Sequence, residues 1–232
     1  MSDDRGVVLV TGAASGIGAA VAAEMADRGW RVAGLDLRES QWDLGLAVDV
    51  SDPTAVADAV QRTERELGPV DAVVTAAGHY AMVPVEQITL EQWTTMLRVH
   101  LGGLLHVVRA VLPGMKERRA GSVVAVTSEL ALGGGADDVH YAAAKGAVIG
   151  LVRSLAAEVA ADGVLVNAVA PGPTDTPLLT ADSPWRDPAY LRTLPAGRLT
   201  APEEVALVVA HLVEEATFMT GEIVSPNSGA VI

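Results

Sequence analysis

The fold is decided by Val7-Val8-Leu9-Val10 and the stretch that follows at once, Thr11-Gly12-Ala13-Ala14-Ser15-Gly16-Ile17-Gly18. Four consecutive apolar residues are typical of a strand buried on both faces. The glycines allow a tight turn, and a helical pattern over 19–28 follows them. An ordinary glycine-rich turn is the alternative. The strand–turn–helix order favours a dinucleotide site, because a helix N-terminus offers free N–H groups and partial positive charge to a pyrophosphate.

The rest of the chain alternates short apolar runs with longer helical patterns. This alternation predicts an α/β fold with a doubly wound parallel sheet of the Rossmann type, about seven strands and helices on both faces. No linker or repeat divides the chain, so residues 1–232 are predicted to form one domain. A proline-rich segment at about 172–202 is expected to be a substrate loop. We expect further strands at 31–35, 46–48, 71–75, 122–127, 165–169 and 223–224, and further helices at about 51–67, 89–112, 141–160 and 203–213.

The composition predicts a large apolar core and an acidic surface. Of the 232 residues, 50% are hydrophobic, and the formal net charge is −13. Such a surface repels nucleic acid and anionic membranes, so neither is an expected partner. The absence of cysteine excludes a disulfide, a thiolate nucleophile and a cysteine metal site, and we predict no metal site. The acidic start and the lack of an apolar run of about 18 residues predict a soluble, cytoplasmic protein.

Tyr141 and Lys145 lie four residues apart in the expected helix 141–160, so their side chains share one face. A phenol with a pKa of about 10 is a poor base at neutral pH. A cation about 4 Å away contributes up to about 4 kcal/mol at an effective dielectric of about 20, equivalent to roughly 3 pKa units. Lys145 is therefore expected to lower the pKa of Tyr141 and to make it useful for proton transfer.

Asp36 ends the expected strand 31–35, about twenty residues after the glycine turn. A carboxylate there can accept hydrogen bonds from the ribose hydroxyls of an adenosine and repel a 2′-phosphate. Arg38 could attract a phosphate instead, but Ser15 in the turn is not basic. We therefore predict that NAD(H) is preferred over NADP(H); a solvated aspartate at a strand end is the alternative.

Together these features resemble the short-chain dehydrogenase/reductase family over essentially the whole chain. Ser128 lies thirteen residues before Tyr141, which is the spacing of the family's catalytic serine. Asp49-Val50, Ala77-Gly78 and Pro171-Gly172 match further family motifs. The resemblance implies cofactor contacts from Gly12, Ser15, Gly16, Ile17, Gly18, Asp36, Asp49, Val50, Ala77, Gly78, Tyr141, Lys145, Pro171, Gly172 and Thr176.

The resemblance also implies the catalytic roles. Tyr141 would exchange a proton with the substrate oxygen, Lys145 would lower its pKa and hold the nicotinamide ribose, and Ser128 would hydrogen-bond the substrate oxygen. Hydride would pass between the substrate carbon and the nicotinamide. Ser128 as a strand-end residue and Thr176 as a helix cap are the alternatives.

The chain departs from the family at three places. His100 stands where the family has an asparagine that holds a water in the proton relay, and we hypothesise that His100 keeps this catalytic role. The alternative is that His100 only fills space and takes no part in the relay. Thr75-Ala76 replaces a pair of asparagines that braces the central strand, and 225–229 replaces the commoner Asp-Gly-Gly.

The expected function is NAD(H)-dependent interconversion of a small secondary alcohol and a ketone. A 3-oxoacyl-carrier-protein reductase is the alternative; the charge of −13 would repel an acidic carrier, although the basic cluster at 116–119 could still dock one. A non-catalytic dinucleotide sensor would be expected to lose Ser128, Tyr141 or Lys145. The family implies a homotetramer through the helices 89–112 and 141–160. His79, Tyr80, Glu129, Leu130 and 178–198 are expected to line the substrate pocket without acting as catalytic groups.

Overall fold

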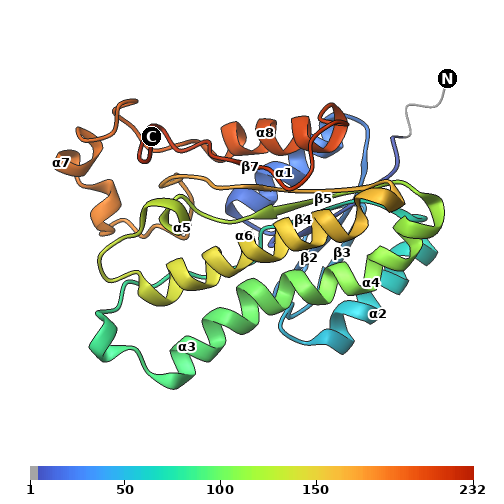
Figure 1. The fold of residues 1–232 in the computed structure, drawn as a ribbon, viewed down its shortest axis with the longest axis horizontal. Coiled ribbons are helices and arrows are strands. Elements are labelled where there is room, and N and C mark those ends of the chain that lie inside the picture. Colours follow the sequence, from blue (N-terminus) through green and yellow to red (C-terminus); the bar gives the residue numbers. More distant parts are fainter. Residues whose placement is uncertain (1–4) are drawn as a thin grey trace.

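A computed structural model describes residues 5–232 and contains one parallel sheet of seven strands (Figure 1). The strand order is β3-β2-β1-β4-β5-β6-β7, and every neighbouring pair is parallel. The order reverses between β1 and β4, which confirms the predicted doubly wound sheet. The strands are β1 Val7–Thr11, β2 Arg31–Asp36, β3 Leu44–Ala47, β4 Val70–Thr75, β5 Gly121–Val126, β6 Val164–Val169 and β7 Ile223–Val224.

Helices cover both faces of the sheet, and each layer buries its own core. Val8 and Val10 face α1 and α8, whereas Val7 and Leu9 face α2, α4 and α6, because successive strand residues point to opposite faces. Figure 1 shows α1 and α8 above the sheet and the other three helices below it. The covering helices are α1 Gly16–Asp27, α2 Pro53–Glu66, α4 Gly103–Arg118, α6 Val139–Val159 and α8 Pro202–Glu214.

The helix expected at 89–112 is longer and is interrupted. A capping box of Thr89 and Gln92 begins α3, Leu90–Leu97. A π-helical turn, Arg98–Gly102, then leads into α4. The predicted end near residue 112 is wrong, because the apolar stripe continues to Met115, which is fully buried against the sheet.

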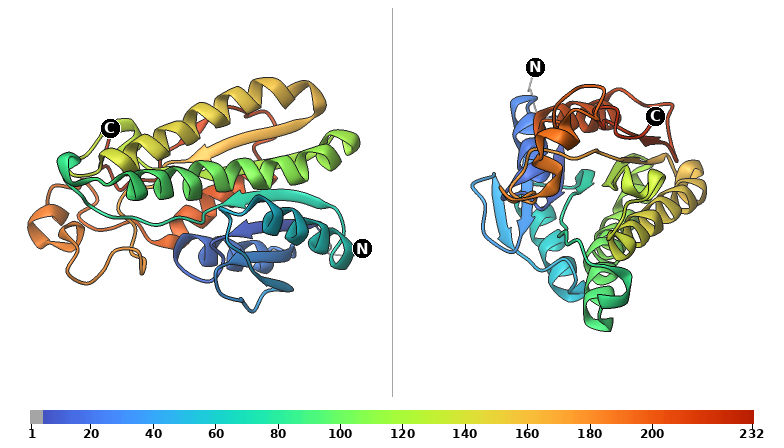
Figure 2. Two further views of the ribbon diagram at one scale, coloured as in Figure 1. Left: turned by 90° about the horizontal axis from the view of Figure 1, so that it is seen from below. Right: turned by 90° about the vertical axis from the view of Figure 1, so that its left-hand side faces the viewer.

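The continuous helical segment Leu90–Arg118 is also long and apolar enough, by length and composition alone, to cross a membrane, and 39% of its most apolar window is buried. A core helix of a soluble protein passes the same test. Figure 2 shows this segment beside α6, packed along one face of the sheet.

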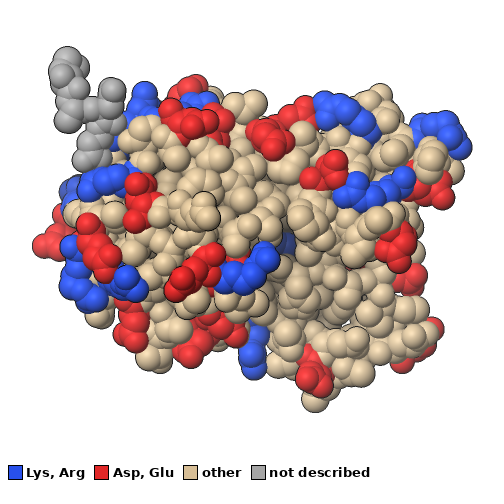
Figure 3. Space-filling view, turned by 180° about the vertical axis from the view of Figure 1, so that it is seen from behind, with Lys and Arg blue, Asp and Glu red and all other residues tan. Residues whose placement is uncertain are grey.

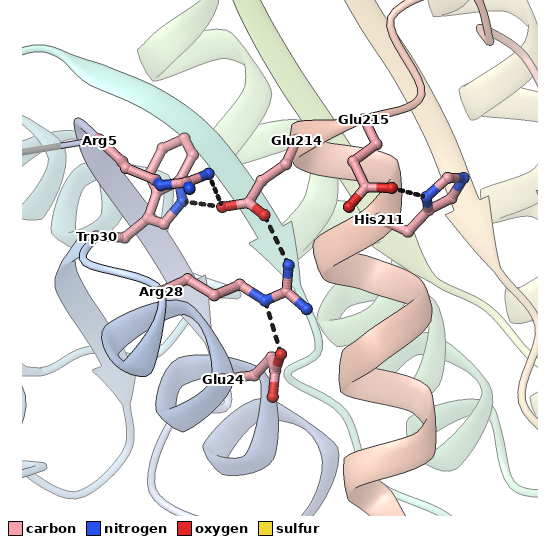
Figure 4. Close-up of polar contacts among 7 residues, drawn as sticks. All are labelled: Arg5, Glu24, Arg28, Trp30, His211, Glu214 and Glu215. Atoms are coloured by element: carbon pink, nitrogen blue, oxygen red, sulfur yellow. Dashed lines mark hydrogen bonds and ion pairs between the residues drawn. The ribbon is translucent and has the colours of Figure 1, made fainter. Parts of the chain in front are cut away.

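The two helices of the upper layer are tied together by Glu214 at the end of α8 (Figure 4). Its carboxylate accepts hydrogen bonds from Arg5 at 3.0 Å, Arg28 at 2.8 Å and the indole of Trp30 at 2.8 Å. One carboxylate therefore joins three parts of the chain that are distant in sequence: the residues before β1, the turn from α1 to β2 and the end of α8.

The proline-rich segment at about 172–202 contains two short helical elements and no long helix. These are the 3₁₀ turn Pro184–Arg186 and α7, Pro188–Leu191. The remaining short elements are Val85–Gln87, α5 Leu130–Gly133 and Ala160–Asp162.

Candidate active site

The carboxyl ends of β1, β4, β5 and β6 meet at one edge of the sheet, beside the point where the strand order reverses. Two adjoining pockets lie there. The larger, about 470 Å³, is lined by the glycine turn and the ends of β2 and β3. The smaller, about 110 Å³, is lined by the ends of β5 and β6 and by α6. They share Ile17, Ala76, Gly78, Thr176 and Leu178, so a long ligand in the larger pocket can reach the smaller one.

The glycine turn has the tight geometry that its sequence predicts. Gly12 and Gly16 have φ angles of 72° and 56°, which favour glycine. A Cβ on Gly18 would lie 2.2 Å from the carbonyl oxygen of Gly12, so a side chain there would force the turn open. Thr11 completes the arrangement: its hydroxyl accepts hydrogen bonds from the N–H groups of Ala76 and Ala77, both at 3.1 Å. Sequence reasoning did not find this brace between β1 and β4.

Asp36 lies in the larger pocket with its carboxylate held by the backbone. It accepts hydrogen bonds from the N–H of Ala14 at 3.1 Å and of Arg38 at 3.2 Å. Asp49 and Val50 line the same pocket from the end of β3. The residues predicted to contact a cofactor therefore converge on this cleft, with the exception of Pro171, Gly172, Tyr141 and Lys145, which line the smaller pocket beside it.

Ser128, Tyr141 and Lys145 line the smaller pocket together, and each is at most 8% exposed. The Lys145 ammonium donates a hydrogen bond to the carbonyl of Val126 at 2.8 Å and lies 5.7 Å from the centre of the Tyr141 ring. The hydroxyl of Thr127 donates to the Lys145 carbonyl at 2.8 Å and so ties α6 to the end of β5. The predicted catalytic set is thus brought into one place.

The expected effect of Lys145 on Tyr141 is not what the structure shows. Burial raises the pKa of Tyr141, the charge of Glu129 raises it further, and only the Ser128 hydroxyl acts in the opposite direction among the leading contributions. Burial also lowers the pKa of Lys145 to about 7. The expectation assumed a charged ammonium about 4 Å from the phenol in a polar medium, whereas both groups are desolvated.

His100 lies in the π-helical turn with its ring packed edge-on against Tyr141, the ring centres being 5.5 Å apart. Its Nε2 is 2.9 Å from the carbonyl oxygen of His79 and 3.3 Å from the backbone nitrogen of His79, so it can donate to the first or accept from the second according to the tautomer. Nδ1 is buried and has no partner among residues 5–232. Burial holds the pKa of His100 well below its ordinary value, so the imidazole is neutral.

Glu129 is a buried carboxyl group that sequence reasoning treated as a pocket wall. It is 5% exposed, and the Ser128 hydroxyl donates a hydrogen bond to its Oε2 at 2.9 Å. Burial raises the pKa of Glu129 to about 7. Its position directly after Ser128 was visible in the sequence, but its burial was not.

The proline-rich segment is anchored beside this pocket through a chain of three side chains. The indole of Trp185 donates a hydrogen bond to the Tyr80 hydroxyl at 2.8 Å, which in turn donates to Asp138 at 2.8 Å. Tyr80 packs edge-on against Tyr141 at 5.0 Å. Tyr80 and Trp185 line the smaller pocket, and the packing of Tyr80 contributes to the burial of Tyr141.

The comparison with known families decides the identity of this arrangement. The sequence model of the family described as short chain dehydrogenase matches residues 6–187. The chain belongs to the short-chain dehydrogenase family. Members of this family are nicotinamide-dependent oxidoreductases of CH–OH and keto groups, and so is this chain.

Named relatives and a solved structure match nearly the full length. The 3-oxoacyl-[acyl-carrier-protein] reductase of Vibrio cholerae is 37% identical, with 96% of each chain covered. The acetoacetyl-CoA reductase of Rhizobium meliloti is 36% identical, with 96% of this chain and 97% of the relative covered. The aldohexose dehydrogenase of Thermoplasma acidophilum has a similar structure, with a TM-score of 0.90, 30% identity and coverage of 98% of this chain and 94% of that one.

The nicotinamide cofactor that the family uses fits the larger pocket. Gly12, Gly16 and Gly18 line this pocket without side chains, so a pyrophosphate can approach the backbone closely there. The N-terminus of α1 begins there with Ser15 as its N-cap, and this cap makes no side-chain hydrogen bond. Its free N–H groups can therefore bind phosphate oxygens.

Proposed function

We propose that this short-chain dehydrogenase interconverts a secondary alcohol and a ketone, with Tyr141 as the acid and base. The observation that carries the proposal is the convergence of Ser128, Tyr141 and Lys145 in one buried pocket that adjoins the glycine-lined cleft. A panel of secondary alcohols and ketones, followed by NADH absorbance, tests it. A purified protein that turns over no member of the panel with either cofactor would contradict it.

Each residue of this site has a separate proposed role. Ser128 hydrogen-bonds the substrate oxygen, and Tyr141 exchanges the proton with that oxygen. Lys145, Pro171, Gly172 and Thr176 hold the nicotinamide end of the cofactor, which supplies or accepts the hydride when bound. Because burial disfavours charge on both Tyr141 and Lys145, tyrosinate is best accommodated when Lys145 is protonated. The two groups are therefore expected to ionise as a pair.

NAD(H) is the proposed cofactor. The carboxylate of Asp36 lies in the cleft after β2, held there by Ala14 and Arg38, where it can accept from ribose hydroxyls and repel a 2′-phosphate. Rates with both cofactors test this proposal, and a clear preference for NADPH would contradict it.

His100 is proposed to hold the proton relay behind Lys145. A cavity of about 10 Å³, close to the size of one water, is lined by Thr11, Thr75, His100 and Lys145 among others. The buried Nδ1 of His100, which has no partner among residues 5–232, can accept from such a water or donate to it according to the tautomer. If His100→Asn leaves both the rate and the pH–rate profile unchanged, the histidine has no special role.

Two substrate classes are compatible with this chemistry. A small secondary alcohol or ketone suits the 110 Å³ pocket with its buried Glu129. A 3-oxoacyl thioester is favoured by the names of the relatives. On the face drawn in Figure 3, basic and acidic side chains are interspersed, so net charge alone does not exclude an acidic carrier. Turnover of acetoacetyl-CoA compared with that of small ketones discriminates between the two classes.

A homotetramer in the cytoplasm is the proposed assembly. Exposed apolar side chains, including Leu90, Trp93, Leu105 and Val139, lie on α3, α4 and α6, the helices that the family resemblance implicates. Light scattering of the purified protein tests the assembly. A non-catalytic sensor is disfavoured because Ser128, Tyr141 and Lys145 are all present, but full turnover by Tyr141→Phe would revive it.

A further inference from the structure

Glu129 and Ser128 form a hydrogen-bonded pair inside the substrate pocket. Both side chains are 5% exposed, and they lie on the turn between β5 and α5. The Ser128 hydroxyl donates to Glu129 Oε2 at 2.9 Å and accepts from the N–H of Leu130 at 3.2 Å. A hydroxyl has one hydrogen. An ionised Glu129 therefore takes the only hydrogen that Ser128 has to give.

Ketone reduction needs the opposite arrangement. A ketone oxygen has no hydrogen, so Ser128 must donate to it in order to polarise it. When Glu129 is protonated, its own O–H can donate to the Ser128 oxygen, and the serine hydrogen is then free for the ketone. Alcohol oxidation has the same requirement, because the alcohol O–H must face Tyr141, and the hydrogen bond to the alcohol oxygen then has to come from Ser128.

We propose that Glu129 is a positioning residue that sets the hydrogen-bonding role of Ser128, and that ketone reduction proceeds through the form with neutral Glu129. The inference rests on the proposed function and names a further residue of the same site. It does not require Glu129 to touch the substrate.

The charge of Glu129 also acts on Tyr141, and this effect likewise favours ketone reduction when Glu129 is neutral. The charge of Glu129 raises the pKa of Tyr141, so neutral Glu129 leaves Tyr141 a stronger acid for protonating the product oxygen. Burial raises the pKa of Glu129 to about 7, so both of its forms are populated near neutrality. The titratable groups that face this carboxyl or its neighbours are Asp138, Tyr141 and Lys145 of the α6 segment and Tyr190 of α7.

The test compares the wild type with Glu129→Gln in the reduction of one ketone from the panel between pH 6 and 9. The wild-type kcat/KM is expected to fall about tenfold from pH 6 to pH 8, because a group with a pKa of about 7 is about nine-tenths ionised at pH 8. Glu129→Gln does not titrate and is expected to lose this step while keeping reductive turnover. Glu203→Gln, an exposed change of the same kind on α8, is the matched control and should keep the wild-type step.

The inference is overturned if Glu129→Gln keeps the fall in kcat/KM between pH 6 and pH 8. That result would assign the titration to Lys145 or to another group. It is also overturned if the variant folds and binds NADH but loses reduction at every pH. Should Glu129→Gln fail to fold, Glu129→Asp decides, because a shorter carboxylate must retain a titrating step, shifted in pH. Difference infrared spectroscopy of the carboxyl band reads the protonation of Glu129 without turnover. If the carboxyl band of the wild type titrates near neutrality but the protein has no activity, the proposed function is refuted. The titration of Glu129 beside Ser128 would still hold in that case.

Discussion

Asp36→Asn is expected to weaken the preference for NAD(H) because it removes the one negative charge at the end of β2 that faces the larger pocket. The amide of this variant keeps one acceptor oxygen, so it can retain a contact with the N–H of Ala14 or of Arg38 but not both. The exposed guanidinium of Arg38 would then act on a 2′-phosphate without an opposing carboxylate.

The size of the effect follows from the charges and their exposure. Two unit charges about 4 Å apart interact by about 1 kcal/mol in water and by about 4 kcal/mol at an effective dielectric of about 20. Asp36 is partly exposed, so the value lies near the lower limit, and a phosphate carries about 1.5 to 2 charges. We therefore expect a change of about 1.5–3 kcal/mol, equivalent to roughly 10- to 150-fold in the NADH-to-NADPH ratio of kcat/KM.

The assay is the steady-state rate with NADH and NADPH, supported by cofactor fluorescence titration, which needs no substrate. Asp49→Asn is the matched control: it removes the same charge from the same pocket, where Asp49 accepts from the N–H of Ser51 at 2.8 Å. It should change affinity for both cofactors together and leave their ratio within about threefold. An unchanged ratio in Asp36→Asn, or an equal shift in Asp49→Asn, would refute the assignment to Asp36.

Three further predictions concern catalysis and stability. Tyr141→Phe should lower turnover by a factor of about 10² to 10⁴, and NADH fluorescence should still show binding; unchanged turnover would exclude Tyr141 as the acid. Burial raises the pKa of Glu214, but hydrogen bonds from Trp30 and Arg28 outweigh it and hold the pKa below its ordinary value. Its stabilisation is therefore present above its ordinary pKa of about 4.5 and is lost as the pH falls through the folded value. Glu214→Gln should cost about 1–3 kcal/mol in urea unfolding at pH 7 and less at pH 3, and an equal cost at both would contradict the role of its charge. Met25→Ala should cost about 2–5 kcal/mol, because Met25 is fully buried between α1 and the sheet; a cost below about 1 kcal/mol would show that the neighbouring side chains close the cavity.

Much of this fold could be predicted because its signals are local. The apolar run before Thr11 needs burial on both faces, so it forms an inner strand whatever its neighbours in the sheet are. Alternating strands and helices allow few connections other than right-handed crossovers. Lys145 follows Tyr141 by one helical turn whatever surrounds them. The strand ends and the end of α4 were less predictable, because packing against the sheet decides where an element stops.

The amino-acid sequence by itself determined the parallel sheet, the glycine turn and the pairing of Tyr141 with Lys145, because each depends on periodicity or spacing along the chain, and the resemblance to the family added Ser128 to this set. Only the tertiary structure decided the protonation behaviour of that set. Trp185 reaches Tyr80 across 105 residues of sequence, and together with His100 these side chains surround Tyr141 and remove it from water. Desolvation depends on neighbours from distant segments, and so the burial that turns Glu129 into a titrating partner of Ser128 is decided by the folded chain.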